Sequence, residues 1–392
     1  MILTSRQRML NALNLEPVDH IPCCFMSFTA LRRRVNEDMR ALTLAELAMG
    51  LDSMLFIPVA PRSERPDHPE LRGLPVRLHP AVQLREWREE GAGDYPILHK
   101  EYITPAGNLR ASVRLSDDWP HGDHIPFVDD FQVSRAVKPL VTAPADLAPL
   151  EYLLQPPAAE DVARFQAEAQ EAHGFVRQHG VLLAGGWGVG VDMAVWLCGV
   201  QNLILMMSDQ PGMAADLLAM IGRWNLARMQ VVLDGKVDLY IRRAWYEGCD
   251  FLSPRLFRNL LLPQIKLEAA LAHEHGAKFG YICTSGAGPV LDAYREAGID
   301  VLIGVDPAQG RHTDMALFKR RLGDRVCLWG GVSGALTVEL GSEREIREAV
   351  AEAIQVLGPV GLILSPIDNI TVDVPETWRN IDLFIDEWRR RR

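Results

Sequence analysis

The chain has 392 residues, of which 48% are hydrophobic and 23% are charged, and its formal net charge is −10. This composition is typical of a globular protein and excludes a disordered or fibrous chain. The negative charge argues against a dedicated nucleic-acid-binding protein, because such a protein needs a basic surface to neutralise phosphates. The length suits two or three average domains or one large barrel.

The cysteines and the N-terminal segment bear on the cellular compartment. The six cysteines form no C-x-x-C pair, so we expect neither a zinc ribbon, nor a redox site, nor a disulfide framework. The first 16 residues lack the apolar core of a signal peptide. No apolar run reaches the roughly 18 residues of a membrane span. We therefore expect a soluble, cytoplasmic protein that binds neither membranes nor nucleic acids.

Short β-type runs alternate with longer helical patterns along the chain, which predicts βα units and a parallel sheet. The predicted strands are residues 20–25, 52–57, 181–184, 239–241, 278–282, 301–305, 326–329 and 361–364. Eight strands of this kind suit a closed (β/α)8 barrel, also called a TIM barrel. The helices between them begin at capping signals, such as Ser253-Pro254 and the pair Ser342 and Glu345. We predict one barrel domain over residues 1–392.

A long segment separates the second and third predicted strands. Residues 58–157 are rich in proline and show little helical periodicity. Within this segment, residues 101–110 are typical of a β-hairpin with its turn from Pro105 to Asn108. A compact barrel does not need an excursion of this length. We therefore interpret residues 58–157 as an insertion that caps the barrel mouth or forms an oligomer contact.

In a barrel enzyme, the catalytic groups lie at the C-terminal ends of the strands. This rule selects polar and aromatic side chains that follow five of the predicted strands. The candidate catalytic residues are Tyr246, Glu247, Asp250 and Asp306, and the candidate substrate-binding residues are Trp187, Arg242, Arg243, Trp245, Tyr281, Ser285 and Asn369.

Two interpretations of Glu247 are open. The run Trp245-Tyr246-Glu247 puts aromatic rings beside a carboxylate. Such a carboxylate is partly desolvated and can act as an acid, a base or a metal ligand near neutral pH. Alternatively, Glu247 forms a structural ion pair with Arg242 or Arg243. On the first interpretation, Glu247→Gln lowers turnover about a hundredfold or more, while the melting temperature stays within a few degrees.

Several segments resemble the uroporphyrinogen decarboxylase superfamily, which also contains the zinc-dependent corrinoid:thiol methyltransferases. They begin with Pro17-Val18-Asp19-His20-Ile21-Pro22 and include residues 104–109, which match the "TPxGxL" hairpin of the superfamily. They continue with Ser253-Pro254, with residues 329–332 and with residues 364–370. The resemblance spans nearly the whole chain. It implies a barrel fold and, because the superfamily tends to pair its barrels, a homodimer.

The chain departs from both well-known activities of this superfamily. Porphyrinogen decarboxylases carry an "MRQAGR" element whose arginines bind propionates, where residues 25–32 read FMSFTALR. The methyltransferases bind zinc through "HxC" and a later cysteine, where this chain has Tyr281, Cys283 and Asp368. Thiolates and carboxylates both bind zinc. A metal site formed by Cys283, Asp368 and Glu247 is therefore a hypothesis.

The leading hypothesis is a methyltransferase-like barrel enzyme. It would move a methyl group between a small methylated compound or a corrinoid and an acceptor, with a corrinoid protein as partner and with zinc if the metal hypothesis holds. The alternative is a cofactor-free decarboxylase of a porphyrinogen-like or other polycarboxylate, with Arg242 and Arg243 as carboxylate clamps. A third hypothesis is a non-catalytic module that binds a ligand or a corrinoid protein.

Overall fold

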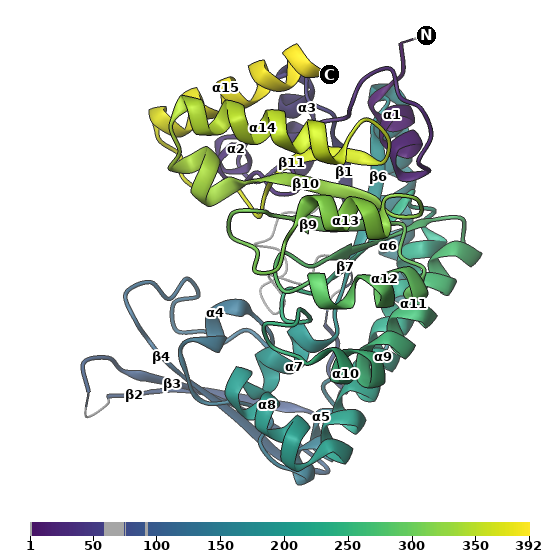
Figure 1. The fold of residues 1–392 in the computed structure, drawn as a ribbon. Helices are drawn as coiled ribbons and strands as arrows, with labels where there is room; N and C mark the ends of the chain where they lie inside the picture. Colours follow the sequence, from purple (N-terminus) through teal and green to yellow (C-terminus); the bar gives the residue numbers. More distant parts are fainter. Residues whose placement is uncertain (1, 59–73, 75, 91–92) are drawn as a thin grey trace. The chain divides into compact units, whose positions relative to one another are not determined.

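The computed structural model describes residues 2–58, 74, 76–90 and 93–392 (Figure 1). The chain divides into two compact units. Unit 1 comprises Met1–Pro61, Gln166–Gly186 and Val232–Arg392, and unit 2 comprises Arg62–Phe165 and Trp187–Val231. The chain therefore leaves unit 1 twice and returns to it twice.

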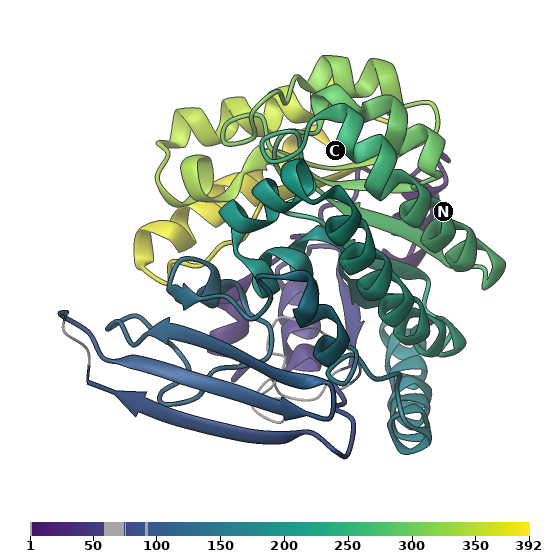
Figure 2. The same ribbon diagram turned by 90° about the horizontal axis from the view of Figure 1, so that it is seen from below.

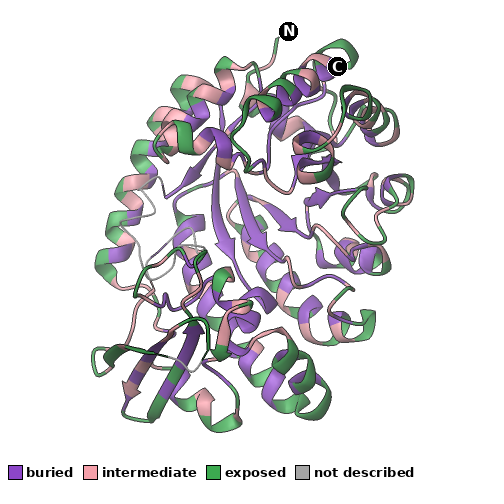
Figure 3. Cartoon of the chain, turned by 90° about the vertical axis from the view of Figure 1, so that its left-hand side faces the viewer, coloured by how far each residue is buried: buried purple, intermediate pink, exposed green. Residues whose placement is uncertain are grey.

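Unit 1 is built on a curled, seven-stranded parallel sheet whose strands follow the order β1-β6-β7-β8-β9-β10-β11. These strands are β1 (Met54–Ile57), β6 (Leu182–Gly188), β7 (Leu239–Arg243), β8 (Lys278–Ile282), β9 (Val301–Val305), β10 (Cys327–Ser333) and β11 (Leu362–Ile367). They are buried along nearly their whole length (Figure 3). Continuous burial is typical of parallel strands that are covered on both faces. The α/β class and seven of the eight predicted strands are thus present.

The predicted strand at residues 20–25 is reduced to one parallel bridge between Cys23 and Leu364 of β11. The Leu364 N–H donates to the Pro22 carbonyl at 2.9 Å, and the Asp52 N–H, just before β1, donates to the Cys23 carbonyl at 2.8 Å. Pro22 has no N–H to offer to a ladder, so a regular strand does not continue there. This short segment therefore links the two edges of the sheet with few hydrogen bonds.

Helices surround the sheet of unit 1. They are α1 (Ser5–Leu13), α2 (Thr29–Arg34), α3 (Met39–Ala48), α10 (Pro254–Leu256), η3 (Phe257–Leu261), α11 (Leu262–Glu274), η4 (Gly288–Val290), α12 (Leu291–Ala297), α13 (Met315–Leu322), η5 (Gly334–Glu339), α14 (Glu343–Leu357) and α15 (Pro375–Arg391). The predicted capping signals are present. The Ser253 side chain caps α10, and Ser342 and Glu345 form a capping box at α14. The caps satisfy backbone N–H groups that the first helical turn leaves unbonded.

Unit 2 contains an antiparallel sheet of four strands in the order β2-β3-β4-β5 (Figure 2). The strands are β2 (Gln83–Glu89), β3 (Ile97–Thr104), β4 (Gly107–Arg114) and β5 (Ala136–Lys138), and the helices of this unit are α4 (Asp130–Val133), η2 (Pro144–Asp146), α5 (Leu147–Leu150), α7 (Val191–Cys198) and α8 (Val200–Asp209). Helices α6 (Ala159–His179) and α9 (Pro211–Asp234) cross the boundary between the units. The predicted hairpin is present as β3 and β4. Its turn is shorter than predicted, because Gly107 and Asn108 already pair with Thr104 and Ile103.

The segment predicted as an insertion, residues 58–157, carries all four strands of this sheet and ends eight residues before the boundary at Phe165. Four of its prolines, Pro61, Pro66, Pro69 and Pro75, lie outside the described residues. The second part of unit 2, Trp187–Val231, was not expected from the sequence. The role of residues 58–157 as a cap or an oligomer contact stays a prediction, as does the interpretation of residues 1–392 as one domain.

Within the described part of the chain, no single helix has the length and apolar composition needed to cross a bilayer, although α7 and α8 together meet that criterion across a bend of 106°. The bend lies at Gly199, whose φ of 76° belongs to the left-handed region that favours glycine.

Candidate functional site

The C-terminal ends of the unit 1 strands lie at one edge of the sheet, because all of its strand pairs are parallel. In barrel-like folds this edge carries the catalytic groups. Most of the candidate residues lie in or just after β7, β8, β9 and β11. They fall into a buried charged network, an aromatic group and several loop contacts.

A buried network begins at Arg242, in β7. Its Nη2 donates to Oε1 of Glu247 at 2.5 Å and its Nη1 donates to Oε2 of Glu268 at 2.6 Å. The Tyr281 hydroxyl, in β8, donates to Oε2 of Glu247 at 2.5 Å. The Gln264 amide donates to the other oxygen of Glu268 at 3.0 Å. Arg242, Glu247, Glu268 and Tyr281 have no exposed surface, so each charge depends on its protein partners.

Electrostatics within this network explain two shifted pKa values. Burial opposes the charge of Arg242, but the carboxylates of Glu247 and Glu268 outweigh it, and the pKa of Arg242 rises well above its usual value. Burial also raises the pKa of Tyr281, and the neighbouring charge of Glu247 raises it further. Both groups therefore keep their protons, and Tyr281 stays a hydrogen-bond donor to Glu247.

The ion pair between Glu247 and Arg242 is one of the two arrangements that the sequence left open. Both carboxylate oxygens of Glu247 are engaged by protein donors. The second carboxylate of the network, Glu268, was missed by the sequence analysis. A signal for it exists, because Glu268 lies on the buried stripe of α11 together with Ile265, Ala269 and Ala272. An acidic residue on such a stripe needs a buried partner.

An aromatic group lies just after β7. The Trp245 indole Nε1 donates to Oδ2 of Asp368, which follows β11, at 3.2 Å. The guanidinium of Arg243 lies 4.5 Å from the centre of the Trp245 ring, a cation–π distance. Trp245 and Asp368 are both partly exposed. These two contacts fix the orientation of the Trp245 ring.

The loops after β7 and β8 contact each other. The Ser285 hydroxyl donates to the Asp250 carboxylate, and the Cys283 thiol donates to the Ser285 carbonyl at 3.2 Å. A Cβ atom at Gly248 would lie 2.1 Å from the Ser285 carbonyl oxygen, so only glycine permits this approach. The Tyr246 ring packs against Phe251 at 5.3 Å. Contacts within and between the two loops therefore fix the positions of three predicted site residues, Tyr246, Asp250 and Ser285.

Asp306 and Asn369 make local contacts that shape the chain. The Asp306 carboxylate accepts the N–H groups of Ala308 and Gln309, both at 2.9 Å, and so closes the loop after β9. Burial raises the pKa of Asp306 above its usual value despite these bonds. Asn369 accepts the Thr29 N–H at 3.1 Å and donates to its hydroxyl at 2.9 Å. The side chains of Asp306 and Asn369 therefore stabilise the local backbone, in addition to any role in function.

Trp187 differs from the other candidate residues in the unit to which it belongs. It lies near the end of β6 with a φ of 77°. It belongs to unit 2, whereas the other candidate residues belong to unit 1. Its predicted role in substrate binding stays a prediction.

The predicted zinc ligands contact other protein groups. Among the described residues, no group of three or more His, Cys, Asp and Glu side chains is placed so that it could hold a metal ion. Glu247 is engaged by Arg242 and Tyr281, Cys283 donates to a carbonyl, and Asp368 accepts from an indole. In this arrangement the three donors are not grouped around one point, and a metal site of Cys283, Asp368 and Glu247 stays an untested hypothesis.

Comparisons with known proteins agree with this fold. A family model described as Uroporphyrinogen decarboxylase (URO-D) matches residues 130–390. The uroporphyrinogen decarboxylase of Coxiella burnetii is 24% identical over 238 residues, which are 58% of this chain and 63% of that relative. The match thus spans less than two thirds of the relative. The solved structure of a methyltransferase from Methanosarcina mazei has a TM-score of 0.60 and 17% identity and covers 99% of both chains, which shows a shared fold.

Proposed function

We propose that this chain, which belongs to the uroporphyrinogen decarboxylase family, transfers a methyl group between a small methylated compound or a corrinoid and an acceptor. The observation that carries the proposal is the engagement of Arg242 by two buried carboxylates. A decarboxylase of polycarboxylates needs cationic donors that can face the substrate. Arg242 is one of the two arginines that the decarboxylase hypothesis assigns to substrate carboxylates. Its guanidinium already forms ion pairs with Glu247 and Glu268.

The segment at residues 25–32 supports the same choice. In place of the arginines that bind propionates in porphyrinogen decarboxylases, Phe25 and Phe28 pack together with ring centres 4.9 Å apart. Phe25 also meets the Phe384 ring edge-on at 5.5 Å, and all three rings are buried. An apolar cluster of this kind offers no donor to a carboxylate.

We assign separate roles to the residues of the site. Trp245 and Asp368 contact the substrate, since both are partly exposed and their hydrogen bond fixes the indole. Arg243 lies over the ring of Trp245 and positions it. Glu247 and Tyr281 act as positioning residues, because Arg242 in β7 and Tyr281 in β8 meet at the carboxylate of Glu247. Tyr246, Asp250 and Asp306 stay proposed catalytic residues.

In a methyl transfer, the bond between the methyl carbon and its donor atom breaks, and a bond to the acceptor forms. An acceptor that carries a proton must lose it to a base. Asp250 is exposed and accepts a hydrogen bond from Ser285, so it is the carboxylate that we propose for this task. The proposed partner is a corrinoid protein. Activation of the acceptor is assigned to the chain's own residues rather than to a zinc ion held by Cys283, Asp368 and Glu247.

The alternative is decarboxylation of a porphyrinogen-like or other polycarboxylate. One observation favours it, the 24% identity with a uroporphyrinogen decarboxylase. In that reaction, Arg243 would be the remaining predicted clamp.

Demethylation of methylcob(III)alamin tests the proposal. The purified chain is mixed with this compound and a thiol acceptor, and loss of the cobalt–methyl bond is followed by absorbance. We expect saturable demethylation that falls in the variant Asp250→Asn. A chain that does not accelerate the reaction over buffer, with any of a series of thiols, argues against corrinoid-linked methyl transfer.

A further inference from the structure

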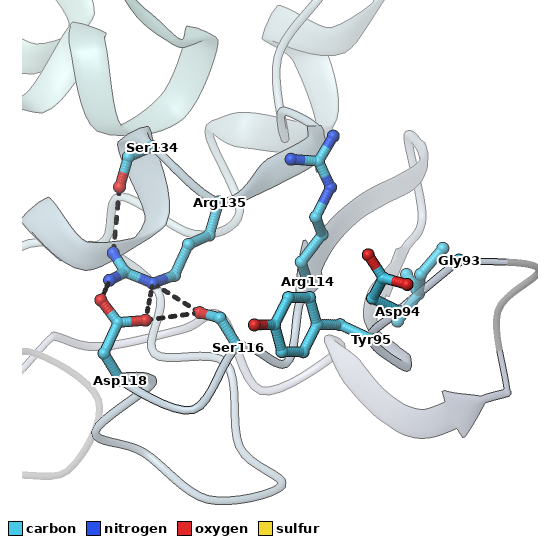
Figure 4. A pocket seen from close by; sticks show the side chains of 9 residues that line it. Gly93, Asp94, Tyr95, Arg114, Ser116, Asp118, Ser134 and Arg135 are labelled. Atoms are coloured by element: carbon cyan, nitrogen blue, oxygen red, sulfur yellow. Dashed lines mark hydrogen bonds and ion pairs between the residues drawn. The ribbon is translucent and has the colours of Figure 1, made fainter.

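Unit 2 holds a cavity of about 510 Å³ at one end of its antiparallel sheet, where β3 begins and β4 ends (Figure 4). Its lining residues are Gly93, Asp94, Tyr95, Ile97, Arg114, Ser116, Asp118, Ser134 and Arg135. A volume of this size is in the range of small-molecule sites. None of these residues belongs to the site proposed for methyl transfer.

The walls of the cavity are fixed by the backbone. The Arg114 N–H donates to the Arg135 carbonyl at 3.0 Å, and the Leu115 N–H donates to the Pro96 carbonyl at 2.9 Å. Leu115 packs against a buried cluster that contains Leu98 and Val113. These contacts fix the part of the wall at Pro96, Arg114 and Arg135, which lowers the entropy cost of binding there.

The guanidinium of Arg135 is bonded to other residues of the cavity wall. Its Nη1 donates to the Ser134 hydroxyl at 2.9 Å, its Nε donates to the Ser116 hydroxyl at 3.0 Å, and its guanidinium pairs with Asp118. Hydrogen bonds from Ser116 and from Arg135 lower the pKa of Asp118, so its carboxylate stays charged. Arg135 and Asp118 thus balance each other, and neither adds net charge to the cavity.

Two lining charges of opposite sign remain. Within the part of the chain that the structure describes, Arg114 and Asp94 form no ion pair with each other and no hydrogen bond through their side chains. In Figure 4, dashed lines reach Arg135 but not Arg114 or Asp94. Tyr95 also lines the cavity. The cavity therefore presents a separate cation, a separate anion and an aromatic ring.

We propose that this cavity binds a small zwitterion, a molecule with a carboxylate and an ammonium group on a short carbon chain. The planar guanidinium of Arg114 matches the carboxylate, because its N–H groups can donate in pairs. Asp94 accepts hydrogen bonds from the ammonium group. Tyr95 and Ile97 contact the carbon chain. A ligand with a single charge satisfies one of the two residues and is repelled by the other.

Binding of ω-amino acids to the purified full chain tests this proposal. Glycine, 4-aminobutyrate and 6-aminohexanoate vary the distance between the two charges, and hexanoate and hexylamine supply each charge alone. We expect one of the amino acids to bind in a saturable manner by calorimetry or NMR, at least about fivefold more tightly than either singly charged compound. The affinity should fall as salt is raised, because the charges are exposed.

Variants locate the binding. Arg114→Gln and Asp94→Asn should each weaken the binding of the best amino acid at least about fivefold. The control is Arg110→Gln, which removes an exposed arginine from the same strand outside the cavity. Equal affinity for zwitterion and single charges, tighter binding by Asp94→Asn, or equal effects of Arg114→Gln and Arg110→Gln would each overturn the proposal. These experiments use no methyl transfer, so their outcome is independent of the proposed function.

Discussion

The Tyr281 hydroxyl donates to Oε2 of Glu247 at 2.5 Å, and Tyr281 stands where the resemblance to the methyltransferases implies a zinc-binding histidine. A tyrosine at this position gives the carboxylate a hydrogen bond. The other oxygen of Glu247 accepts from Arg242 at 2.5 Å. Glu247 therefore takes part in a buried ion pair with Arg242 and in a hydrogen bond with Tyr281.

Replacing Glu247 tests the buried ion pair. Glu247→Gln removes one of two carboxylates that compensate Arg242, and we expect the free energy of unfolding to fall by about 3 kcal/mol. This differs from the expectation from the sequence, in which stability is nearly unchanged. Urea denaturation measures the effect, and turnover is recorded on the same preparations.

The matched control is Glu296→Gln. Glu296 pairs with Arg258 and Lys266, but it is 45% exposed, so we expect a change within about 1 kcal/mol. If Glu247→Gln keeps wild-type stability and loses turnover about a hundredfold, Glu247 is a catalytic acid or base and its structural role is refuted.

Trp245→Phe tests the role of the indole N–H. The ring beside Arg243 is kept, but the hydrogen bond to Asp368 is lost. Without this bond the ring is no longer fixed in the orientation in which we propose that it contacts the substrate, so turnover should fall about tenfold or more. The melting temperature should stay within a few degrees.

Trp378 provides a close control for this variant. Its indole donates to Asp373 at 2.7 Å, and Arg34 lies 4.0 Å from its ring. Trp378→Phe should leave turnover unchanged. An equal loss of turnover in Trp245→Phe and Trp378→Phe would mean that Trp245 contributes to stability and not to the reaction.

Glu46 gives the fold a defined pH dependence. Burial raises its pKa from about 4.5 to about 8, although a hydrogen bond from Ser53 acts in the opposite direction. Because the native state keeps this proton up to higher pH than the unfolded state, the contribution to stability is complete below about pH 4.5 and is lost as pH rises through 8. Glu46→Gln cannot ionise, so its stability relative to the wild type should increase between pH 5 and pH 9.

Urea unfolding at these two pH values measures this difference. The exposed Glu348→Gln variant should show the same small effect at both values. A constant difference between Glu46→Gln and the wild type would show that Glu46 is ionised in the native protein at pH 5.

Zinc analysis tests the hypothesis of a metal site. After exposure to zinc and gel filtration, the wild type, Cys283→Ser and Asp368→Asn should contain the same molar ratio of zinc, because these donors do not converge in the structure. A lower ratio in either variant would restore the zinc hypothesis.

Short apolar runs in the sequence made most strands of the unit 1 sheet predictable. The predicted ranges 278–282 and 301–305 coincide with β8 and β9, since buried parallel strands read as continuous apolar runs. Residues 20–25 carry the same signal, but they form only one bridge at Cys23. Whether an apolar segment forms a regular hydrogen-bonded strand depends on its register and on neighbouring strands that a single sequence does not reveal.

The contacts of the site were less predictable. The strand-end rule found Arg242, Glu247 and Tyr281, but Glu268 reaches Arg242 from a helix 26 residues further along the chain. The joining of Trp187–Val231 with Arg62–Phe165 in one unit also depends on tertiary packing. No local propensity encodes contacts of this kind.

The central claim is methyl transfer rather than decarboxylation, and one paired assay with isotope-labelled substrates tests it most directly. The purified chain is given cob(I)alamin with a panel of methyl-labelled thioethers, amines and aryl ethers, and, separately, carboxyl-labelled uroporphyrinogen. The account predicts that label from at least one methyl compound appears on the corrinoid and that no labelled carbon dioxide is released. Release of labelled carbon dioxide without any methyl transfer would contradict it.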